Sequence, residues 1–481
     1  MSRKIMAKGL YCLMIFFWGC KLTEPSLPKY YVHTPPSFDF NGQGDSLSPA
    51  TWELLCVDSQ LVAFIDTALQ NNYDMAMAMQ RLAIARAQVR YFTGQQFPSL
   101  MLEAGAGQRR HGEYTEAGVG NYDTRLSPNI PPDKMIPDPI PDYFAGGAVS
   151  WELDLWGKLR NKRKSAIARF YATREGMLLT KTTIVSEVAM TYYRLLALNS
   201  KLKIIEDNIR LQEKGLRIVS VQKEVGKVTE LAVKQFESQL LNARGEREEL
   251  KQQWIETESY LNFLLARYPQ PLDLKKEIMG SALPASVTRG IHSGMLLLRP
   301  DVRQAEMELI AAHADVRAAR AALFPSVIIS ASAGYNAFNP SVLFSPASVA
   351  YNFVGGITAP LFNRSALRAG YLSARAYREE VLLNYQKTIM NGFYEVYTLV
   401  NHLHQMERLF LLKQQEMQNL MVSLDAWEEL FMSGRASYLE ILISQKQLLK
   451  VKQELVDIRL NQFMALIKLY KAAGGGWQFN K

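Results

Sequence analysis

The sequence predicts a mostly α-helical protein with a small membrane-embedded β part. Two spans without proline, Gly157 to Tyr268 and Asn363 to Ala473, each exceed one hundred residues, which favours very long helices. Four short segments, near residues 100, 150, 330 and 355, alternate apolar with small or polar side chains, as strands do. The same order of elements occurs twice, so the chain holds two tandem structural repeats.

The second proline-free span carries a stripe of apolar residues at alternating steps of four and three. A strict 3.5-residue period places them on one side of a helix and indicates a coiled coil with a partner helix. At 1.5 Å per residue, residues 363–432 would extend for roughly 100 Å. The spacing resumes from Leu439 to Tyr470, so we expect the chain to turn back at Gly434; one longer helix through the glycine is the alternative. The stripe comprises Leu399, Leu403, Met406, Phe410, Lys413, Met417, Leu420, Leu424, Trp427 and Phe431.

Residues 1–19 have the features of an export signal. Three basic residues precede an apolar stretch, residues 9–18, which is too short to anchor the chain across a bilayer permanently. Their removal leaves a mature chain that begins with residues 20–58. This segment is proline-rich and polar, which favours an extended N-terminal arm.

Gly19-Cys20 is similar to the lipobox of bacterial lipoproteins, which implies a covalent lipid on Cys20. Phe17 and Trp18 are unusual before such a cysteine, so cleavage nearby by a different peptidase is the alternative. Lys21 differs from the aspartate that resembles an inner-membrane retention signal, and this favours sorting to the outer membrane.

The formal net charge is +9, but basic residues alternate with acids along the helices, as in residues 247–251. That pattern favours a solvated face, and no aromatic and basic cluster suggests nucleic-acid binding. If Cys20 is acylated, Cys56 is the one free thiol of the mature chain, and no disulfide can form within it.

The repeat has a constant offset in residue number over its first half. Phe97-Pro98-Ser99 corresponds to Phe324-Pro325-Ser326, for example. Each copy is predicted to contain a helix, a strand, a loop, a strand, a very long helix, a turn and a long helix. The predicted divisions are residues 59–268 for the first repeat, 269–298 for a mixed linker, 299–473 for the second repeat and 474–481 for a C-terminal tail.

The predicted strands have one apolar face and one small or polar face. This alternation is typical of outer-membrane barrels, although a half-buried soluble sheet would also show it. Four strands cannot close a membrane barrel, because the smallest have eight, so several protomers must share one. We expect the strand-joining loops Gln108 to Asp142 and Asn336 to Ala350 to face outside. Aromatic residues lie near the strand ends, where interfacial girdles occur: Phe97, Tyr143, Phe144, Trp156, Phe324, Tyr335 and Phe362.

Three motifs resemble the TolC-like outer-membrane efflux factors, in particular the lipoprotein branch that serves resistance-nodulation-division pumps. They are residues 151–157 (WELDLWG), 298–306 (LRPDVRQAE) and 318–326 (AARAALFPS). The resemblance implies a homotrimer with one shared twelve-stranded outer-membrane β-barrel and a periplasmic α-helical tunnel. It also implies two partners, a periplasmic adaptor and an inner-membrane transporter, besides outer-membrane lipid.

The resemblance further implies a pore aperture at the far end of the tunnel, where the family places rings of acidic residues. Glu440 matches the position of the first ring, six residues beyond Gly434. Ile443 occupies the second position, so a double ring is in doubt here. A carboxylate ring would raise the local cation concentration in a narrow pore. A solvated carboxylate at a helix end is the alternative for Glu440.

The turn of the first copy is expected at Gly226, which corresponds to Gly434. Arg435 lies at one turn, and Lys227 and Glu230 lie at the other. Their location makes these three residues candidate charge partners at the aperture.

No motif for a phosphate loop, a zinc-binding helix or a dinucleotide site is present, so we expect a passive export conduit without cofactor or enzymatic activity. The expected cargo is drugs or other small molecules. Alternatives are the outer component of type I protein secretion or of metal efflux, and a structural envelope lipoprotein without a channel. His402 and His404 prompt the metal alternative, but a step of two places them on different helix faces.

Overall fold

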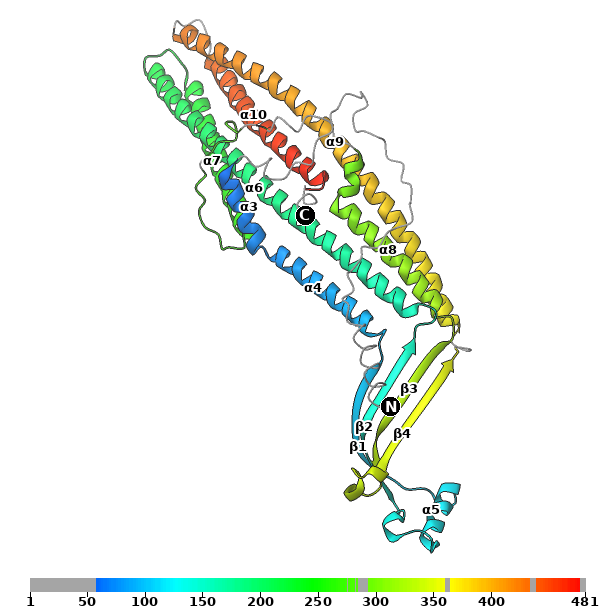
Figure 1. Cartoon of the computed structure of the whole chain (residues 1–481). Coiled ribbons are helices and arrows are strands. Elements are labelled where there is room, and N and C mark those ends of the chain that lie inside the picture. Colours follow the sequence, from blue (N-terminus) through cyan, green and yellow to red (C-terminus); the bar gives the residue numbers. More distant parts are fainter. Residues whose placement is uncertain are drawn as a thin grey trace. The chain divides into compact units, whose positions relative to one another are not determined.

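The computed structural model describes residues 58–274, 276–281, 283, 293–359, 364–432 and 438–475. Long helices dominate, and four strands form one sheet, which confirms the predicted fold class (Figure 1). Cys20, Gly434, Arg435 and Phe362 lie outside the described residues, as do most of the N-terminal arm and of the tail. The elements are α3 Ser59–Asn71, α4 Tyr73–Gly94, β1 Ser99–Arg109, α5 Glu116–Leu126, η2 Pro132–Lys134, β2 Ile140–Leu153, α6 Lys158–Glu224, α7 Glu230–Leu264, η4 Ser293–Leu298, α8 Pro300–Ala321, β3 Ser326–Ala337, η5 Pro340–Val342, η6 Pro346–Ser348, β4 Val349–Thr358, α9 Arg364–Met432 and α10 Tyr438–Ala472.

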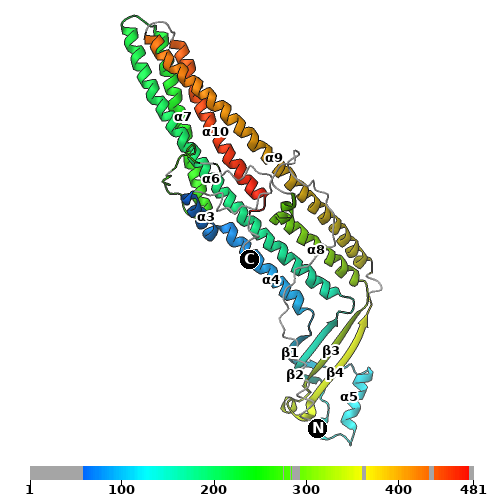
Figure 2. The same ribbon diagram turned by 45° about the horizontal axis from the view of Figure 1, so that its top comes forward.

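The internal repeat is visible in the element bounds. At the offset that aligns the two copies, both ends of α4 coincide with the ends of α8, and the start of β1 coincides with the start of β3. Helices α6 and α9 have 67 and 69 residues, and each is followed by a helix of 35 residues, α7 or α10. In both ribbon views, α7 lies beside the C-terminal part of α6, and α10 lies beside the C-terminal part of α9 (Figures 1 and 2).

The described residues fall into two compact units, and each unit draws on both repeats. The first contains the sheet with the adjoining helix ends, residues 84–171 and 307–382. The second contains the remaining helical residues, including 172–306 and 383–475. The predicted boundaries at 59–268 and 299–473 follow the sequence repeat rather than these units, and they stay predictions.

A stripe of apolar residues at near-heptad spacing on α6, from Val185 to Ile209, forms the core of the helical unit. Its side chains are at most 6% exposed where they pack against α3, α7 and α10. The ring of Tyr193 stacks on that of Phe463 in α10, with 4.0 Å between centroids. Burying such a stripe is what stabilises helices of this length. The buried stripe residues are Val185, Val188, Tyr192, Leu195, Leu198, Ile205 and Ile209.

The apolar stripe of α9 contacts α10 at Leu403, Phe410 and Lys413. Its one polar member, Lys413, places Nζ 2.7 Å from the Glu454 carboxylate of α10, and the guanidinium of Arg459 lies over the ring of Phe410. Leu403 is buried with Leu466 and Leu469 of α10. The polar position is therefore accommodated by charge pairing across the helical hairpin.

A buried arginine joins three helices of the same unit. The guanidinium of Arg299, which precedes α8, donates to the Asp301 carboxylate at 2.8 and 3.0 Å, to Glu395 of α9 at 3.0 Å and to the Ala472 carbonyl of α10 at 2.9 Å. Its side chain is 7% exposed. The charge is thus fully paired and hydrogen-bonded, as a buried guanidinium must be.

The sheet is antiparallel, with strand order β1-β2-β3-β4. The predicted loop from Gln108 to Asp142 joins β1 to β2, but the structure differs from the prediction in its bounds and in its content. The segment contains helix α5, capped by the Thr115 hydroxyl, and its ends belong to strands, because β1 extends to Arg109 and β2 begins at Ile140. Pro141 is tolerated because it lies next to the first residue of β2. No helix among the described residues is long and apolar enough to cross a bilayer.

Candidate functional site

One face of the sheet is apolar across all four strands. Directly opposed residues in an antiparallel sheet point to the same side, so the register identifies the members of each face. In the single chain Leu102, Tyr351 and Phe353 are 84%, 84% and 71% exposed. Such a face requires lipid or another protein to cover it. Two adjacent rows of this face are Leu100, Val149, Ala331, Phe353 and Leu102, Gly147, Ala333, Tyr351.

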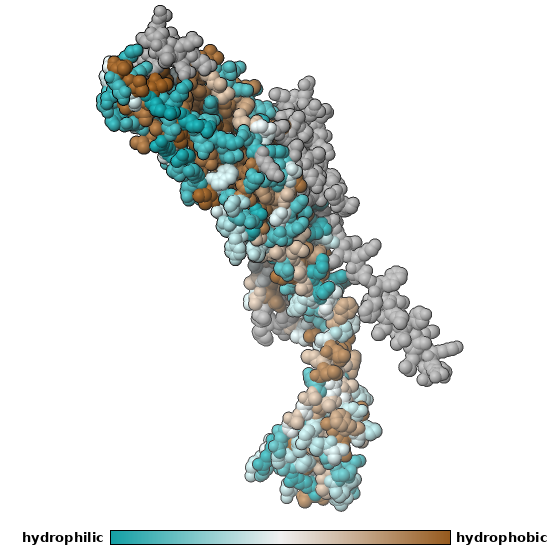
Figure 3. Space-filling model, turned by 90° about the vertical axis from the view of Figure 1, so that its left-hand side faces the viewer, coloured by the Kyte–Doolittle hydropathy of each residue, from teal (hydrophilic) through white to brown (hydrophobic). Residues whose placement is uncertain are grey.

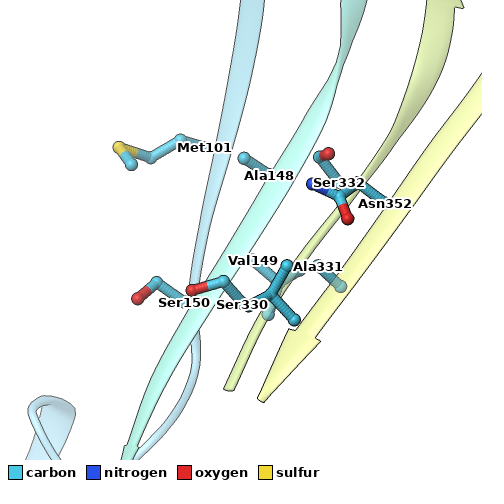
Figure 4. Close-up of a pocket in the computed structure, with 9 residues that line it drawn as sticks. Met101, Ala148, Val149, Ser150, Ser330, Ala331, Ser332 and Asn352 are labelled. Carbon is cyan, nitrogen blue, oxygen red and sulfur yellow. The ribbon is translucent and has the colours of Figure 1, made fainter. Parts of the chain in front are cut away.

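The opposite face carries small and polar side chains and is hollowed. A pocket of about 160 Å³ opens on it, lined by Ser150, Ser330, Ser332 and Asn352 together with the apolar side chains of Met101, Ala148 and Val354 (Figure 4). The sheet is therefore apolar on one side and carries mostly small and polar side chains on the other, as the strands of a water-filled barrel do.

The sheet has two open edges. Strands β1 and β4 are the outermost, and neither pairs on its outer side within the described residues. An unpaired backbone N–H or C=O costs several kcal/mol in hydrocarbon, so these edges cannot stay open in a membrane. They are compatible with a membrane only if strands of other chains pair with them.

Aromatic side chains mark the end of the sheet nearest the helices. The rings of Trp156 and Phe324 stack with 5.0 Å between centroids, and Trp156 Nε1 donates to the Pro325 carbonyl at 2.7 Å. Both rings, with Phe97, are about half exposed. Figure 3 shows apolar side chains gathered at this end of the sheet and hydrophilic ones at its loop end. Exposed Trp and Phe are typical of a bilayer interface.

The turn between α6 and α7 closes around Gly226. Its φ of +73° is left-handed, its N–H donates to the Lys223 carbonyl at 2.9 Å, and the Lys227 N–H donates to the Gln222 carbonyl at 2.8 Å. These two bonds form the Schellman motif that ends a helix at glycine. The predicted turn at Gly226 is confirmed, while that at Gly434 lies outside the described residues.

In the structure Glu230, one of the predicted aperture residues, pairs with Lys223, a residue that the sequence analysis did not name. Lys223, in the last turn of α6, forms an ion pair with Glu230, the first residue of α7. Lys234 places Nζ 3.9 Å from Oε1 of the same Glu230 carboxylate. The hydrogen bond from Lys223 lowers the pKa of the Glu230 carboxyl below its ordinary value. Lys223 and Glu230 have opposite charges and lie on either side of the turn glycine, so the sequence alone could have predicted this pair.

Glu440 lies in the first turn of α10 with an exposed side chain. Two residues further on, Leu442 is 3% exposed and packs with Val233 and Phe236 of α7, whereas Ile443 is 56% exposed. This contact places the start of α10 beside the α6–α7 hairpin. The predicted aperture residues Glu440, Glu230 and Lys227 therefore belong to one end of the helical unit, and Arg435 is outside the described residues.

Among the described residues, no group of three or more His, Cys, Asp or Glu side chains is arranged to hold a metal ion. His402 and His404 lie on α9, where His404 is exposed and His402 is half-buried. They stay ordinary helix residues in our interpretation.

Sequence comparisons match most of the chain to known proteins. The family described as outer membrane efflux protein matches residues 64–267 and 293–475. The cation efflux system protein CusC of Escherichia coli O157:H7 is 28% identical over 477 residues, which are 97% of this chain and 98% of that protein. The solvent efflux pump outer membrane protein SrpC of Pseudomonas putida is 28% identical over 97% of this chain and 98% of its own. The pyoverdine export outer membrane protein OpmQ of P. putida is 29% identical, covering 91% and 90%.

Solved structures agree. A crystal structure of CusC superposes with a TM-score of 0.80 at 26% identity and covers 94% of this chain and 99% of CusC. The outer membrane channel CmeC of Campylobacter jejuni has the same fold, with a TM-score of 0.80 at 20% identity over 96% of each chain.

Proposed function

The chain belongs to the outer membrane efflux protein family, and from that premise we propose that three copies share one twelve-stranded barrel and one helical tunnel. It is an outer-membrane export channel, not an enzyme. Each copy contributes four strands and the α6–α7 and α9–α10 hairpins. The assembly is a passive conduit from the periplasm to the outside.

The open sheet carries this proposal. Its apolar face suits lipid, its face of small and polar side chains suits a water-filled lumen, and its edges need partners. Pairing β1 of each copy with β4 of the next satisfies both edges at once. A closed ring of identical chains follows from one repeated contact of this kind.

We further propose a lipid anchor at Cys20 and partners at the helical hairpins. A thioether-linked lipid on Cys20 would tether the N-terminal arm to the outer membrane, and no other cofactor is expected. A periplasmic adaptor and an inner-membrane transporter would meet the helical hairpins. Since the chain carries no motif for an energy source, the transporter must supply the energy.

The aperture would be formed by the helix ends around Gly226 and Gly434. Three copies of Glu440 would make a carboxylate ring, with the Lys223–Glu230 pair and Arg435 nearby. The exposed position of Glu440 in the first turn of α10 supports this role. The exposed Ile443 in place of a second acid supports a single ring.

The cargo we propose is small molecules, and metal cations are the second candidate. The relatives are named for cations, pyoverdine and solvents at nearly equal identity, so channel sequence at this level does not select among them. The cation alternative is supported by the similarity to CusC over 97% of the chain. A strain lacking this gene, exposed separately to organic solvents and to transition-metal salts, would discriminate by which treatment inhibits its growth. If the channel instead serves type I protein secretion, loss of the gene would leave tolerance to solvents and to metal salts unchanged and would abolish export of a secreted protein.

Conductance of the purified protein in a planar bilayer tests the proposal. We expect SDS-resistant trimers that insert as single events of fixed conductance. Glu440→Ala should raise the open probability or the conductance of each event. Monomers that never conduct, or trimers that stay silent after this substitution, would contradict a conduit.

A further inference from the structure

The positive charge of the chain is concentrated on the helix ends beside the sheet. Within the unit that contains the sheet, four helical segments, residues 84–94, 158–171, 307–321 and 365–382, carry thirteen lysines and arginines but four acidic residues. Removal of residues 1–19, which carry three basic residues and no acid, lowers the formal net charge from +9 to +6. The surplus of nine therefore exceeds the net charge of the mature chain, whose remaining residues carry a net charge of −3. We call these four segments the basic belt.

Most cations of the belt have no acidic partner among the residues that the structure describes. Four cations have acidic partners: Lys158 pairs with Glu152 at 2.5 Å, Arg160 with Asp154 at 3.3 Å, Arg169 with Asp315 at 2.6 Å, and Arg378 pairs with Glu379. The other nine form no ion pair with a described residue. Arg90, Lys164, Arg317, Arg320 and Arg368 are among the exposed ones.

The belt begins at the level of the aromatic girdle. Lys158 starts α6 two residues after Trp156, whose half-exposed ring stacks on Phe324. At 1.5 Å per residue, residues 158–164 rise by about 9 Å. The headgroup layer on each side of a bilayer is about 5–7 Å thick. If the aromatic rings lie at the interface, these cations lie within the headgroups or immediately beyond them.

Some cations of α6 face the membrane whatever the rotation of this helix about its own axis. Successive residues of an α-helix are rotated by about 100°, so the five cations between Lys158 and Lys164 lie at about 0°, 200°, 40°, 140° and 240° around its axis. No direction is more than about 60° from one of them. Some therefore point outward whichever way the helix is turned, and their long side chains can reach the headgroups.

We propose that the basic belt binds anionic phospholipid headgroups of the leaflet on the helical side of the membrane. This inference rests on the proposed membrane insertion of the sheet. The phosphodiester of such a lipid matches the guanidinium and ammonium donors, and a charged headgroup within about 8 Å is only weakly screened at physiological salt. The belt would fix the depth of the barrel in the membrane and collect a shell of acidic lipids around it.

Quenching of Trp156 fluorescence by brominated lipids tests this proposal. The trimer is reconstituted in phosphatidylcholine containing brominated phosphatidylglycerol or, separately, brominated phosphatidylcholine, and a Trp156→Phe variant isolates the signal of this residue. For the native protein we expect relative binding of phosphatidylglycerol over phosphatidylcholine of at least about threefold. Lys162→Gln/Arg163→Gln/Lys164→Gln should bring the ratio close to one. Lys446→Gln/Lys450→Gln/Lys452→Gln, in α10, removes equal charge and should leave the preference intact.

Every outcome is informative. Equal quenching by both lipids in a native trimer that still conducts would overturn the lipid proposal and leave the conduit standing. Loss of the preference on adding inorganic phosphate at constant ionic strength would show that the belt binds free phosphate, and would also overturn it. A protein that neither trimerises nor conducts would instead contradict the proposed function. Conductance of the belt variant confirms that it is folded.

Discussion

Lys223 and Glu230 form an ion pair that bridges the turn between α6 and α7. Lys223 lies in the last turn of one helix, Glu230 is the first residue of the next, and Gly226 lies between them. The pair joins the ends of the hairpin at the proposed aperture.

The pair should make the turn sensitive to acid. The pKa of Glu230 is lowered in the folded chain, chiefly by the hydrogen bond from Lys223. The pair therefore stabilises the turn above the ordinary carboxyl pKa of about 4.3, and this contribution is lost as the pH falls through the lower folded value. Amide hydrogen exchange of residues 220–232 should accelerate over that range, beyond the intrinsic pH dependence. Lys223→Gln should abolish the additional acceleration; an unchanged pH profile in this variant would contradict the assignment.

Gly226→Ala should weaken the same turn. A φ of +73° costs a side-chain-bearing residue about 1–2 kcal/mol, although the space around this glycine is open. We expect a lower thermal midpoint and faster local exchange at the turn. Gly245→Ala is the control: it lies within α7 with no atom within 4 Å of an added Cβ, and alanine there should stabilise the helix by up to about 1 kcal/mol. Equal effects at both sites would show that backbone conformation does not govern the turn.

Leu442→Ala should loosen the contact between α10 and the first hairpin. The side chain is 3% exposed among Val233, Phe236 and Val219, so its truncation should cost about 2–5 kcal/mol. Limited proteolysis should then cleave the start of α10 sooner. Ile443→Ala removes a similar volume from an adjacent residue that is 56% exposed, and it should change cleavage little. A larger effect from Ile443 would mean that the two faces of α10 are reversed.

Gly146→Ala should disrupt the sheet, whereas Gly147→Ala should be tolerated. A Cβ on Gly146 would lie 2.6 Å from the Ala333 carbonyl oxygen and 2.8 Å from Gly334 Cα. On Gly147 the nearest atom, of Leu102, is at an ordinary 3.5 Å. We expect a loss of the order of 1–3 kcal/mol for the first substitution, seen as a lower temperature of trimer dissociation on a gel. Similar dissociation temperatures for the two variants would contradict the register of β2 against β3.

The helical part of the fold could be predicted from the sequence because its signals are periodic. The stripe from Leu399 to Phe431 and the turn at Gly226 each arise from one local rule, and the constant offset in residue number relates the two repeats to each other. Helix α5 was missed because the prolines of its segment mask a short capped helix. Pairing of Lys413 with Glu454 depends on two helices meeting in space, and no local pattern contains it.

The candidate site was predicted less completely. Glu230 was singled out, but its partner is Lys223, because the geometry of the turn decides which lysine reaches the carboxylate. The surplus of positive charge was interpreted as a solvated face, because residues such as 247–251 show basic residues beside acids. Residues 158–171, with six basic residues and no acid, are a local signal against that interpretation. The meeting of this run with three other basic segments beside one sheet could not be predicted, because the four lie far apart in the sequence.

The central claim is that chains complete one another's sheets, and a disulfide scan between the two sheet edges tests it most directly. In a chain with Cys56→Ser, cysteines are placed at Glu103 of β1 and, one at a time, at Ala350, Asn352 and Val354 of β4, the polar-face positions of that strand. The account predicts that at least one pairing oxidises between chains, and that the covalent products end at three linked chains. If trimers form but no pairing yields a linked product, the shared barrel is contradicted.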